Sequence, residues 1–183
     1  NHIRTLSELG ALGGVVESNY EVLNSLKSTY PEIQFFSDLE SALSHGFDGF
    51  TVATPAETHF KIAKQILETG SHVLVEKPLS LTSEDAVILQ ELSVNKNVNL
   101  MVGHVLLFHP AILRIKEVLK AGKLGKLQYL YSNRLNLGAV RKEENILWSF
   151  APHDISLFQL TRVLKDKYAP QQKRTADWFV NRD

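Results

Sequence analysis

The sequence predicts an α/β protein: a doubly wound parallel sheet followed by part of a second domain of the α+β class. Helix-like and strand-like segments alternate over residues 1–103, and the strand-like segments are almost continuously apolar, as strands buried on both faces must be. After residue 103 the pattern changes to a helix and then to an alternating segment. We therefore expect one domain over residues 1–103 and a partial second domain over residues 104–183.

Apolar spacing and turn residues set the elements of the first domain. Ile3, Leu6 and Leu9 share one helical face before Gly10, and Pro31 ends the next helix. The expected elements, in chain order, are a helix at 3–9, a strand at 12–17, a helix at 22–30, a strand at 33–36, a short helix ending at 43, a strand at 50–53, a helix at 58–69, a strand at 72–75, a helix starting at 82 or 83, and a strand at 98–102.

The second domain begins with a predicted helix over residues 110–121, which Gly122 ends. Residues 127–137 then alternate between apolar and polar side chains. This alternation is typical of an antiparallel strand with one face in water, and it gives the second domain its α+β character.

Composition excludes several classes of function. The 183 residues include 20 Lys and Arg against 20 Asp and Glu, so no summed positive charge attracts nucleic acid or anionic lipid. Without cysteine the chain forms no disulfide and no cysteine-ligated zinc site, and the spacing of His104 and His109 does not favour a metal pair. Apolar runs are only strand-length and the start lacks a signal-peptide core, so we expect no membrane span and a cytoplasmic location.

Ligands of doubly wound sheets bind beyond the carboxyl ends of the strands, so the residues that follow each strand are candidates for a binding site. Glu17 follows "GVV" (14–16), where a carboxylate can accept hydrogen bonds from both hydroxyls of an adenosine ribose. It would also repel a 2′-phosphate, which favours NAD over NADP. A solvated carboxylate in a turn explains the same residue equally well.

A second loop carries Thr54 and Pro55, and His59 follows in the next helix. Proline restricts the loop, and the start of a helix offers free amide groups to a cofactor. The same residues also fit the plain start of a helix. We take Thr54, Pro55 and His59 as candidate cofactor-binding residues.

The third loop, Glu76-Lys77-Pro78, is harder to explain as structure alone. A lysine at the end of a buried strand costs desolvation free energy, which lowers its pKa toward the range useful for proton transfer. Pro78 restricts the backbone of Lys77, and Glu76 can pair with Lys77 or with a cofactor ribose. A strand-terminal ion pair in solvent is the structural alternative.

The segment "TVATPAETHFKIAKQILETGSHVLVEKPLSLTSEDA" (51–86) resembles the core signature of the Gfo/Idh/MocA family of NAD(P)-dependent oxidoreductases. The similarity continues through "MVGH" (101–104) and "FHPAILRIKEVLKAGKLGKL" (108–127), and less strongly through "YSNRLNL" (131–137) and "WSFAPHDISL" (148–157). The resemblance implies a Rossmann-like domain followed by an α+β domain that holds the substrate.

The resemblance also implies roles for single residues. Lys77 of the EKP motif and His153 of "APHDIS" would share the substrate hydroxyl as an acid/base pair, because an alcohol releases hydride only if the charge on its oxygen is stabilised. Similarity to the nucleotide-sugar branch implies a sugar or nucleotide-sugar substrate, with Arg134 and Asn136 at its phosphate or hydroxyl groups. It further implies a homo-oligomer formed through the C-terminal sheet.

The sequence departs from the family pattern at both ends. It contains no GxGxxG motif, and the family's first strand and Gly-rich loop would precede the helix at 3–9. We therefore expect a Rossmann-like sheet without its central strand, which leaves an apolar slot. The strands that complete the substrate sheet are not recognised after about residue 160, so we expect the middle of a longer enzyme. The alternative is a non-catalytic remnant of the fold that serves as a binding or assembly module.

Overall fold

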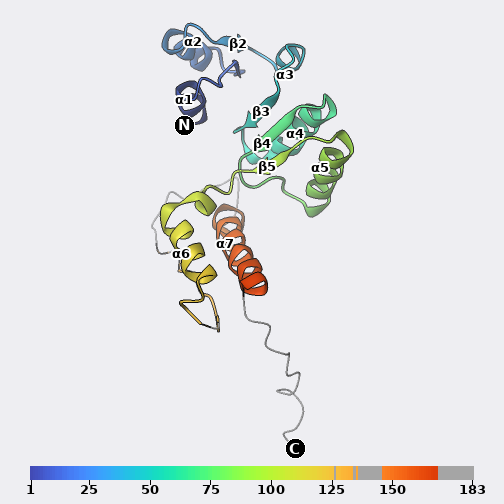
Figure 1. Ribbon diagram of the computed structural model, residues 1–183. Helices are drawn as coiled ribbons and strands as arrows, with labels where there is room; N and C mark the ends of the chain where they lie inside the picture. The colour runs from blue at the N-terminus through green and yellow to red at the C-terminus, as the bar shows by residue number, and fades with distance from the viewer. Residues whose placement is uncertain (126, 134, 136–145, 169–183) are drawn as a thin grey trace, which may run out of the picture. The chain divides into compact units, whose positions relative to one another are not determined.

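The computed structural model describes residues 1–125, 127–133, 135 and 146–168 (Figure 1). The chain divides into two compact units, Asn1–Gly103 and His104–Asp183. All strands of the described residues belong to the first unit.

Strands and helices alternate through the first unit, as the apolar spacing predicts. Their bounds lie within two residues of the predicted ones, except that the helix expected from residue 58 is preceded by a short 3-10 turn. In chain order the elements are α1 (His2–Glu8), β1 (Gly14–Val16), α2 (Tyr20–Thr29), β2 (Gln34–Phe36), α3 (Leu39–Leu43), β3 (Gly49–Val52), η1 (Ala56–Thr58), α4 (His59–Glu68), β4 (His72–Val75), α5 (Ser83–Lys96) and β5 (Leu100–Val102).

The strands form two parallel sheets. β1 pairs with β2, and β3 pairs with β4, which in turn pairs with β5. β1 and β3 are not hydrogen-bonded to each other, so the two halves of the doubly wound sheet are separate. The parallel strands and the helices between them confirm the expectation of a Rossmann-like fold.

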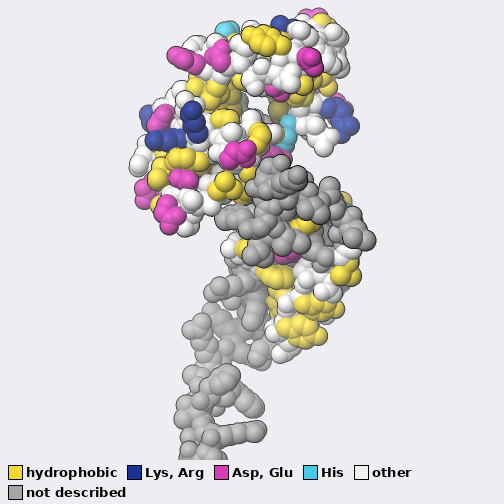
Figure 2. Space-filling model, turned by 180° about the vertical axis from the view of Figure 1, so that it is seen from behind, with side chains coloured by type: hydrophobic (Ala, Val, Ile, Leu, Met, Phe, Trp, Pro, Cys, Tyr) yellow, Lys and Arg dark blue, Asp and Glu magenta, His cyan; other side chains and the backbone are white. Residues whose placement is uncertain are grey.

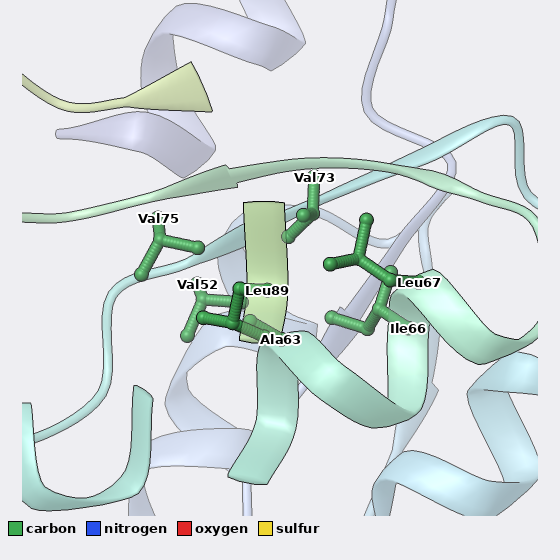
Figure 3. Close-up of a cluster of buried hydrophobic side chains, with 7 residues drawn as sticks. All are labelled: Val52, Ala63, Ile66, Leu67, Val73, Val75 and Leu89. Atoms are coloured by element: carbon green, nitrogen blue, oxygen red, sulfur yellow. The ribbon is translucent and has the colours of Figure 1, made fainter. Parts of the chain in front are cut away.

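The largest core of the first unit lies between the β3–β4–β5 sheet and the helices α4 and α5 (Figure 3). Near-continuous apolar strands supply one side of it, and the inward faces of the helices supply the other. A valine, leucine or isoleucine side chain contributes about 1.5–3 kcal/mol to the free energy of folding when it is fully buried. The buried members are Val52, Ala63, Ile66, Leu67, Val73, Val75 and Leu89.

Aromatic rings connect the β1–β2 sheet to the start of β3. The ring of Phe47 packs edge-on against Phe36 of β2 and Phe50 of β3, with centroid distances of 6.0 and 5.9 Å. A Cβ atom at Gly13 or Gly14 would lie 2.8 or 2.9 Å from carbon atoms of this ring. Both positions therefore need glycine, and side-chain packing takes the place of ladder hydrogen bonds between the two sheets.

The second unit contains η2 (Val105–Phe108), α6 (Pro110–Lys120) and α7 (Ile146–Tyr168). The helix α6 matches the one predicted over residues 110–121. We did not predict α7, and Pro152 inside it removes one main-chain hydrogen bond of the helix. Packing of α7 against α6 offsets that loss.

The antiparallel strand predicted over residues 127–137 is not formed in the described part of that segment. Residues 127–133 and 135 belong to no helix or strand. A strand needs a hydrogen-bonded neighbour, and no described segment of the second unit is a strand. The apolar side chains of Tyr129, Tyr131 and Leu135 are consequently 76%, 74% and 89% exposed.

Charges of both signs are interspersed on the face of the first unit that Figure 2 shows. This distribution agrees with the formal net charge of zero and offers no broad basic surface on that face. Among the described helices, none combines the length and the apolar character that crossing a bilayer requires.

Candidate active and cofactor site

The loops that follow β3 and β4 lie side by side. The two strands are parallel neighbours with Val52 opposite Val75, so the chain leaves both at the same edge of the sheet. The backbone N–H of Glu76 then donates to the carbonyl oxygen of Val52 over 2.9 Å. The predicted loops at 54–55 and 76–78 therefore meet at the carboxyl edge, where ligands of doubly wound sheets bind.

His59 joins these two loops. It is the first residue of α4, and it is only 1% exposed. Its Nε2 lies 2.8 Å from the carbonyl oxygen of Thr54, and its Nδ1 lies 2.6 Å from the carbonyl oxygen of Pro78. Both ring nitrogens of this candidate residue are thus occupied by the protein's own main chain.

The loop after β3 presents its surface to solvent. Thr54 and Pro55 are exposed. The hydroxyl of Thr58 donates to the carbonyl oxygen of Pro55 over 2.7 Å and lies 2.6 Å from the hydroxyl of Thr54. Because a hydroxyl has one proton, Thr54 is the donor in the second contact, and the loop is held in shape by side chains beneath an accessible surface.

The loop after β4 is more enclosed. Lys77 is half-buried, Pro78 is buried, and the peptide bond between them is cis. Ser80 is also buried, and its hydroxyl donates to the carbonyl oxygen of Thr82 over 2.7 Å. Lys77, the predicted catalytic lysine, is therefore followed by a segment in which Pro78 and Ser80 are buried.

Glu76 has a partner that sequence reasoning missed. Nε2 of His2, in α1, lies 2.7 Å from Oε1 of Glu76, and both side chains are about one-third exposed, at 37% and 30%. A Cβ atom at Gly103 would lie 3.0 Å from Oε2 of Glu76, so the glycine after β5 makes room for this carboxylate. The two residues are 74 positions apart, and no local pattern reveals such a contact.

Glu17 lies just after β1 and is half-buried. Its Oε1 accepts a hydrogen bond from the backbone N–H of Asn19 over 2.8 Å. The other carboxylate oxygen accepts no hydrogen bond from the described residues, so it can accept one from a ligand hydroxyl. Glu17 thus stabilises the turn after β1 through one carboxylate oxygen, and the other oxygen can still accept a hydrogen bond from a ribose hydroxyl.

The remaining candidates belong to the second unit. His153 lies in α7 and is half-buried, and its carbonyl oxygen accepts from the hydroxyl of Ser156 over 2.7 Å. The next residue, Asp154, accepts from the hydroxyl of Ser132 over 2.8 Å. Arg134 and Asn136, the candidate substrate residues, lie outside the described residues.

His104, the first residue of the second unit, is a half-buried histidine whose Nδ1 atom is buried. Burial lowers the pKa of its ring, and its Nδ1 has no hydrogen-bond partner among the described residues. The ring is therefore neutral at pH 7. In the part of the chain that the structure describes, no group of three or more His, Asp or Glu side chains is arranged to hold a metal ion.

Comparison with known proteins places these loops in a family context. A family model described as an oxidoreductase family with an NAD-binding Rossmann fold, GFO_IDH_MocA, matches residues 2–104. The UDP-N-acetylglucosamine 3-dehydrogenase of Acidithiobacillus ferrooxidans is 27% identical over 157 residues, which cover 85% of this chain and 48% of that protein. The 1-carboxy-3-chloro-3,4-dihydroxycyclohexa-1,5-diene dehydrogenase of Comamonas testosteroni is 31% identical over 111 residues, 60% of this chain and 28% of that one.

A solved structure of another dehydrogenase is also similar to this chain in three dimensions. The WlbA dehydrogenase of Bordetella pertussis, in complex with NADH and UDP-GlcNAcA, superposes with a TM-score of 0.63 at 25% identity, over 69% of this chain and 40% of that one. This chain spans about half the length of these relatives, or less. The family match extends over more than half of the chain and includes all three strand-end loops, so the chain belongs to the Gfo/Idh/MocA family of oxidoreductases with an NAD-binding Rossmann fold.

Proposed function

We propose that this chain supplies the NAD-binding domain and part of the substrate domain of a dehydrogenase that acts on a secondary alcohol of a sugar or nucleotide sugar. The observation that carries the proposal is the meeting of the Thr54-Pro55 and Glu76-Lys77-Pro78 loops at one sheet edge. Family membership supports NAD-linked oxidoreduction, and the substrate class rests on relatives that are dehydrogenases of nucleotide sugars.

The described residues suit NAD in two respects. Glu17 has a carboxylate oxygen available for the hydroxyls of the adenosine ribose, and its negative charge would repel the 2′-phosphate of NADP. Thr54 and Pro55 offer an accessible surface beside the Lys77 loop. We therefore propose Glu17, Thr54, Pro55, Glu76, Lys77 and Pro78 as the residues that hold the cofactor, and we assign His59 to the support of their loops.

In the proposed reaction, NAD supplies a hydride acceptor when it is bound. The ammonium group of Lys77 stabilises the negative charge that develops on the substrate oxygen, and the imidazole of His153 takes up the hydroxyl proton. Arg134 and Asn136 are proposed to hold the phosphate or sugar hydroxyls of the substrate.

We also propose that the complete enzyme is a cytoplasmic homo-oligomer assembled through its C-terminal domain. The exposed rings of Tyr129 and Tyr131 support this, because adjacent aromatic side chains left in water are typical of an association surface.

A non-catalytic role is the second candidate, and one observation favours it. Among the described residues the parallel strands form two separate sheets, β1–β2 and β3–β4–β5, rather than one continuous sheet. On this view the fold persists as a binding or assembly module with little affinity for NAD.

Binding of NADH to the full chain separates the two candidates. We expect NADH to raise the unfolding temperature of the wild-type chain and to show altered nicotinamide fluorescence on binding. The absence of both responses at millimolar NADH would favour the non-catalytic module.

Measurements of turnover then test the catalytic role that we propose for Lys77. NADH formation from UDP-N-acetylglucosamine and related nucleotide sugars is followed by absorbance for the wild type, Lys77→Ala and Lys64→Ala. The last variant is a matched control, since Lys64 is a half-buried lysine of α4 that pairs with Glu68 and belongs to neither strand-end loop. Lys77→Ala is expected to reduce kcat by about 100-fold or more, whereas Lys64→Ala retains activity. Turnover retained by Lys77→Ala removes this residue from the mechanism.

A further inference from the structure

The side chain of Glu76 meets two other elements of the first unit. Glu76 is the first residue after β4, and its backbone N–H donates to the carbonyl oxygen of Val52 over 2.9 Å, so the sheet fixes its main chain. One carboxylate oxygen, Oε1, lies 2.7 Å from Nε2 of His2, the first residue of α1. The other oxygen, Oε2, faces Gly103, the residue after β5. The carboxylate therefore lies where α1 and the ends of two strands come together.

Gly103 indicates that this position of the carboxylate is built into the fold. A Cβ atom at residue 103 would lie 3.0 Å from Oε2 of Glu76 and 3.2 Å from its Cδ, distances tighter than nine in ten contacts of real Cβ atoms. The φ of Gly103 is not positive, so its backbone conformation does not call for glycine. Its N–H donates to the carbonyl oxygen of Val75 over 2.8 Å, which fixes it beside the loop. The carboxylate, rather than the turn, therefore requires glycine at this position.

The contact between His2 and Glu76 joins a donor ring to an acceptor carboxylate. An ionised carboxylate has no proton to donate, so Nε2 of His2 is the donor. Both an imidazolium and the neutral tautomer with its proton on Nε2 meet this condition, so the contact needs no particular charge on the ring. At 2.7 Å it has the length of a hydrogen bond in which one partner is ionised, and such bonds are stronger than neutral ones.

Lys77 follows Glu76 directly, so the backbone angles of Glu76 set the direction in which Lys77 leaves the strand. His2 holds the carboxylate of Glu76 on one side, and the main chain at Gly103 limits it on the other. Together these contacts restrict both the side chain and the backbone of Glu76. A catalytic group needs such restriction, because a displacement of about 1 Å can cost a factor of about 100 in rate.

We propose that His2 is a positioning residue for the Glu76-Lys77-Pro78 loop. It acts through the carboxylate of Glu76, which connects α1 to the backbone that carries Lys77, and Gly103 provides the space for that connection. Loss of the His2 side chain leaves the loop attached to the sheet but lets it adopt more than one direction. The effect on the loop follows from these contacts alone, whereas the effect on turnover rests on the proposed function.

NMR relaxation of the full chain without NADH tests the effect on the loop. In the wild type we expect the backbone N–H groups of Lys77 and Leu79 to have order parameters of about 0.85, the value of a rigid backbone. In His2→Ala we expect them to fall toward about 0.6, or to show exchange broadening on the μs–ms timescale. Arg4→Ala, in the same helix, is the control and should leave both amides as in the wild type. Equal relaxation of the loop in His2→Ala and Arg4→Ala overturns the proposal.

Two further variants test whether His2 acts through Glu76. The side-chain amide of Gln can also donate to the carboxylate, so His2→Gln should restore most of the rigidity that His2→Ala loses. In a Glu76→Ala background the carboxylate is already absent, so adding His2→Ala should change the loop no further. An effect of His2→Ala that is equally large with and without Glu76 refutes the proposed route.

Turnover and NADH binding are scored separately from the motion of the loop. With NAD and UDP-N-acetylglucosamine or a related nucleotide sugar, we expect kcat to fall about tenfold in His2→Ala, to recover in His2→Gln and to stay unchanged in Arg4→Ala. A loop that becomes mobile in His2→Ala, in a chain whose wild type binds no NADH, upholds the positioning role and refutes the proposed function. A loop that stays rigid in His2→Ala refutes the positioning role, whether or not NADH binds.

Discussion

At the residue scale, the position of the Glu76 carboxylate depends on residues far away in the chain. His2 contacts one of its oxygens, and Gly103 leaves space for the other. Glu76 directly precedes Lys77, so these two residues help to set the direction in which the proposed site faces. His2, the Glu76-Lys77 pair and Gly103 are far apart in the sequence. They lie close together only because α1, β4 and β5 come together in the folded unit.

We expect His2→Ala to lower the free energy of unfolding by up to about 1 kcal/mol, because the His2–Glu76 pair is partly exposed. Chemical denaturation measures this change. Arg4→Ala in the same helix is the matched control, since Arg4 is more exposed and lies 3.8 Å from Glu8, and its effect should be close to zero. Equal effects of the two substitutions would show that the contact with Glu76 contributes no stability.

At the element scale, side-chain caps start several of the helices. Asn19 caps α2, Asp38 caps α3 and Thr82 caps α5, each by accepting a hydrogen bond from a backbone N–H in the first turn. Such residues are recognisable in a sequence because the cap and the turn it begins are only three residues apart. The bounds of these helices were therefore predictable to within two residues.

The cap of α3 makes a pH-dependent contribution to stability. The backbone N–H of Ser41 holds the pKa of Asp38 below its ordinary value of 3.8, with help from the Ser41 hydroxyl. Since the folded pKa lies below the unfolded one, the contribution is complete above pH 3.8 and is lost as the pH falls below 3.8 and through the folded pKa. We expect the difference in unfolding temperature between the wild type and Asp38→Asn to shrink as the pH falls through that range.

Asp48 supplies the control for this measurement. It lies in the turn before β3, and its carbonyl, not its side chain, accepts the hydrogen bond from the His72 N–H. Asp48→Asn should therefore show a much smaller pH-dependent difference from the wild type. An Asp38→Asn difference that grows on acidification would contradict the sign derived from the lowered pKa.

At the scale of the whole molecule, the core beneath the strand-end loops supports the proposed site. Leu89 of α5 is completely buried against α4 and the sheet. Leu89→Ala should cost about 2–5 kcal/mol of unfolding free energy because it leaves a cavity in a closely packed region. Val94→Ala, in the same helix at 71% exposure, should change it by less than about 0.5 kcal/mol. A Leu89→Ala effect as small as that of Val94→Ala would mean that this core does not stabilise the unit.

The expectation of an antiparallel strand over residues 127–137 shows where pattern reasoning fails. Tyr129 and Tyr131 occupy alternate positions, with Gln128 and Ser132 outside them and the apolar Leu130 between them, but a strand is a property of a pair of hydrogen-bonded segments. We did not predict the helix α7, for another reason. It contains Pro152, and a proline usually interrupts or ends a helix. In both cases the contacts made by the segment, rather than its own composition, decide its conformation.

The sequence by itself determined the order of helices and strands in the first unit, the three strand-end loops and the family, because periodicity, caps and turn residues act over a few neighbouring positions. Only the tertiary structure decided that His59 faces a carbonyl in each of two loops and that His2 reaches Glu76. Contacts of this kind join residues from separate elements, and the free energy that selects them exists only once the chain has packed.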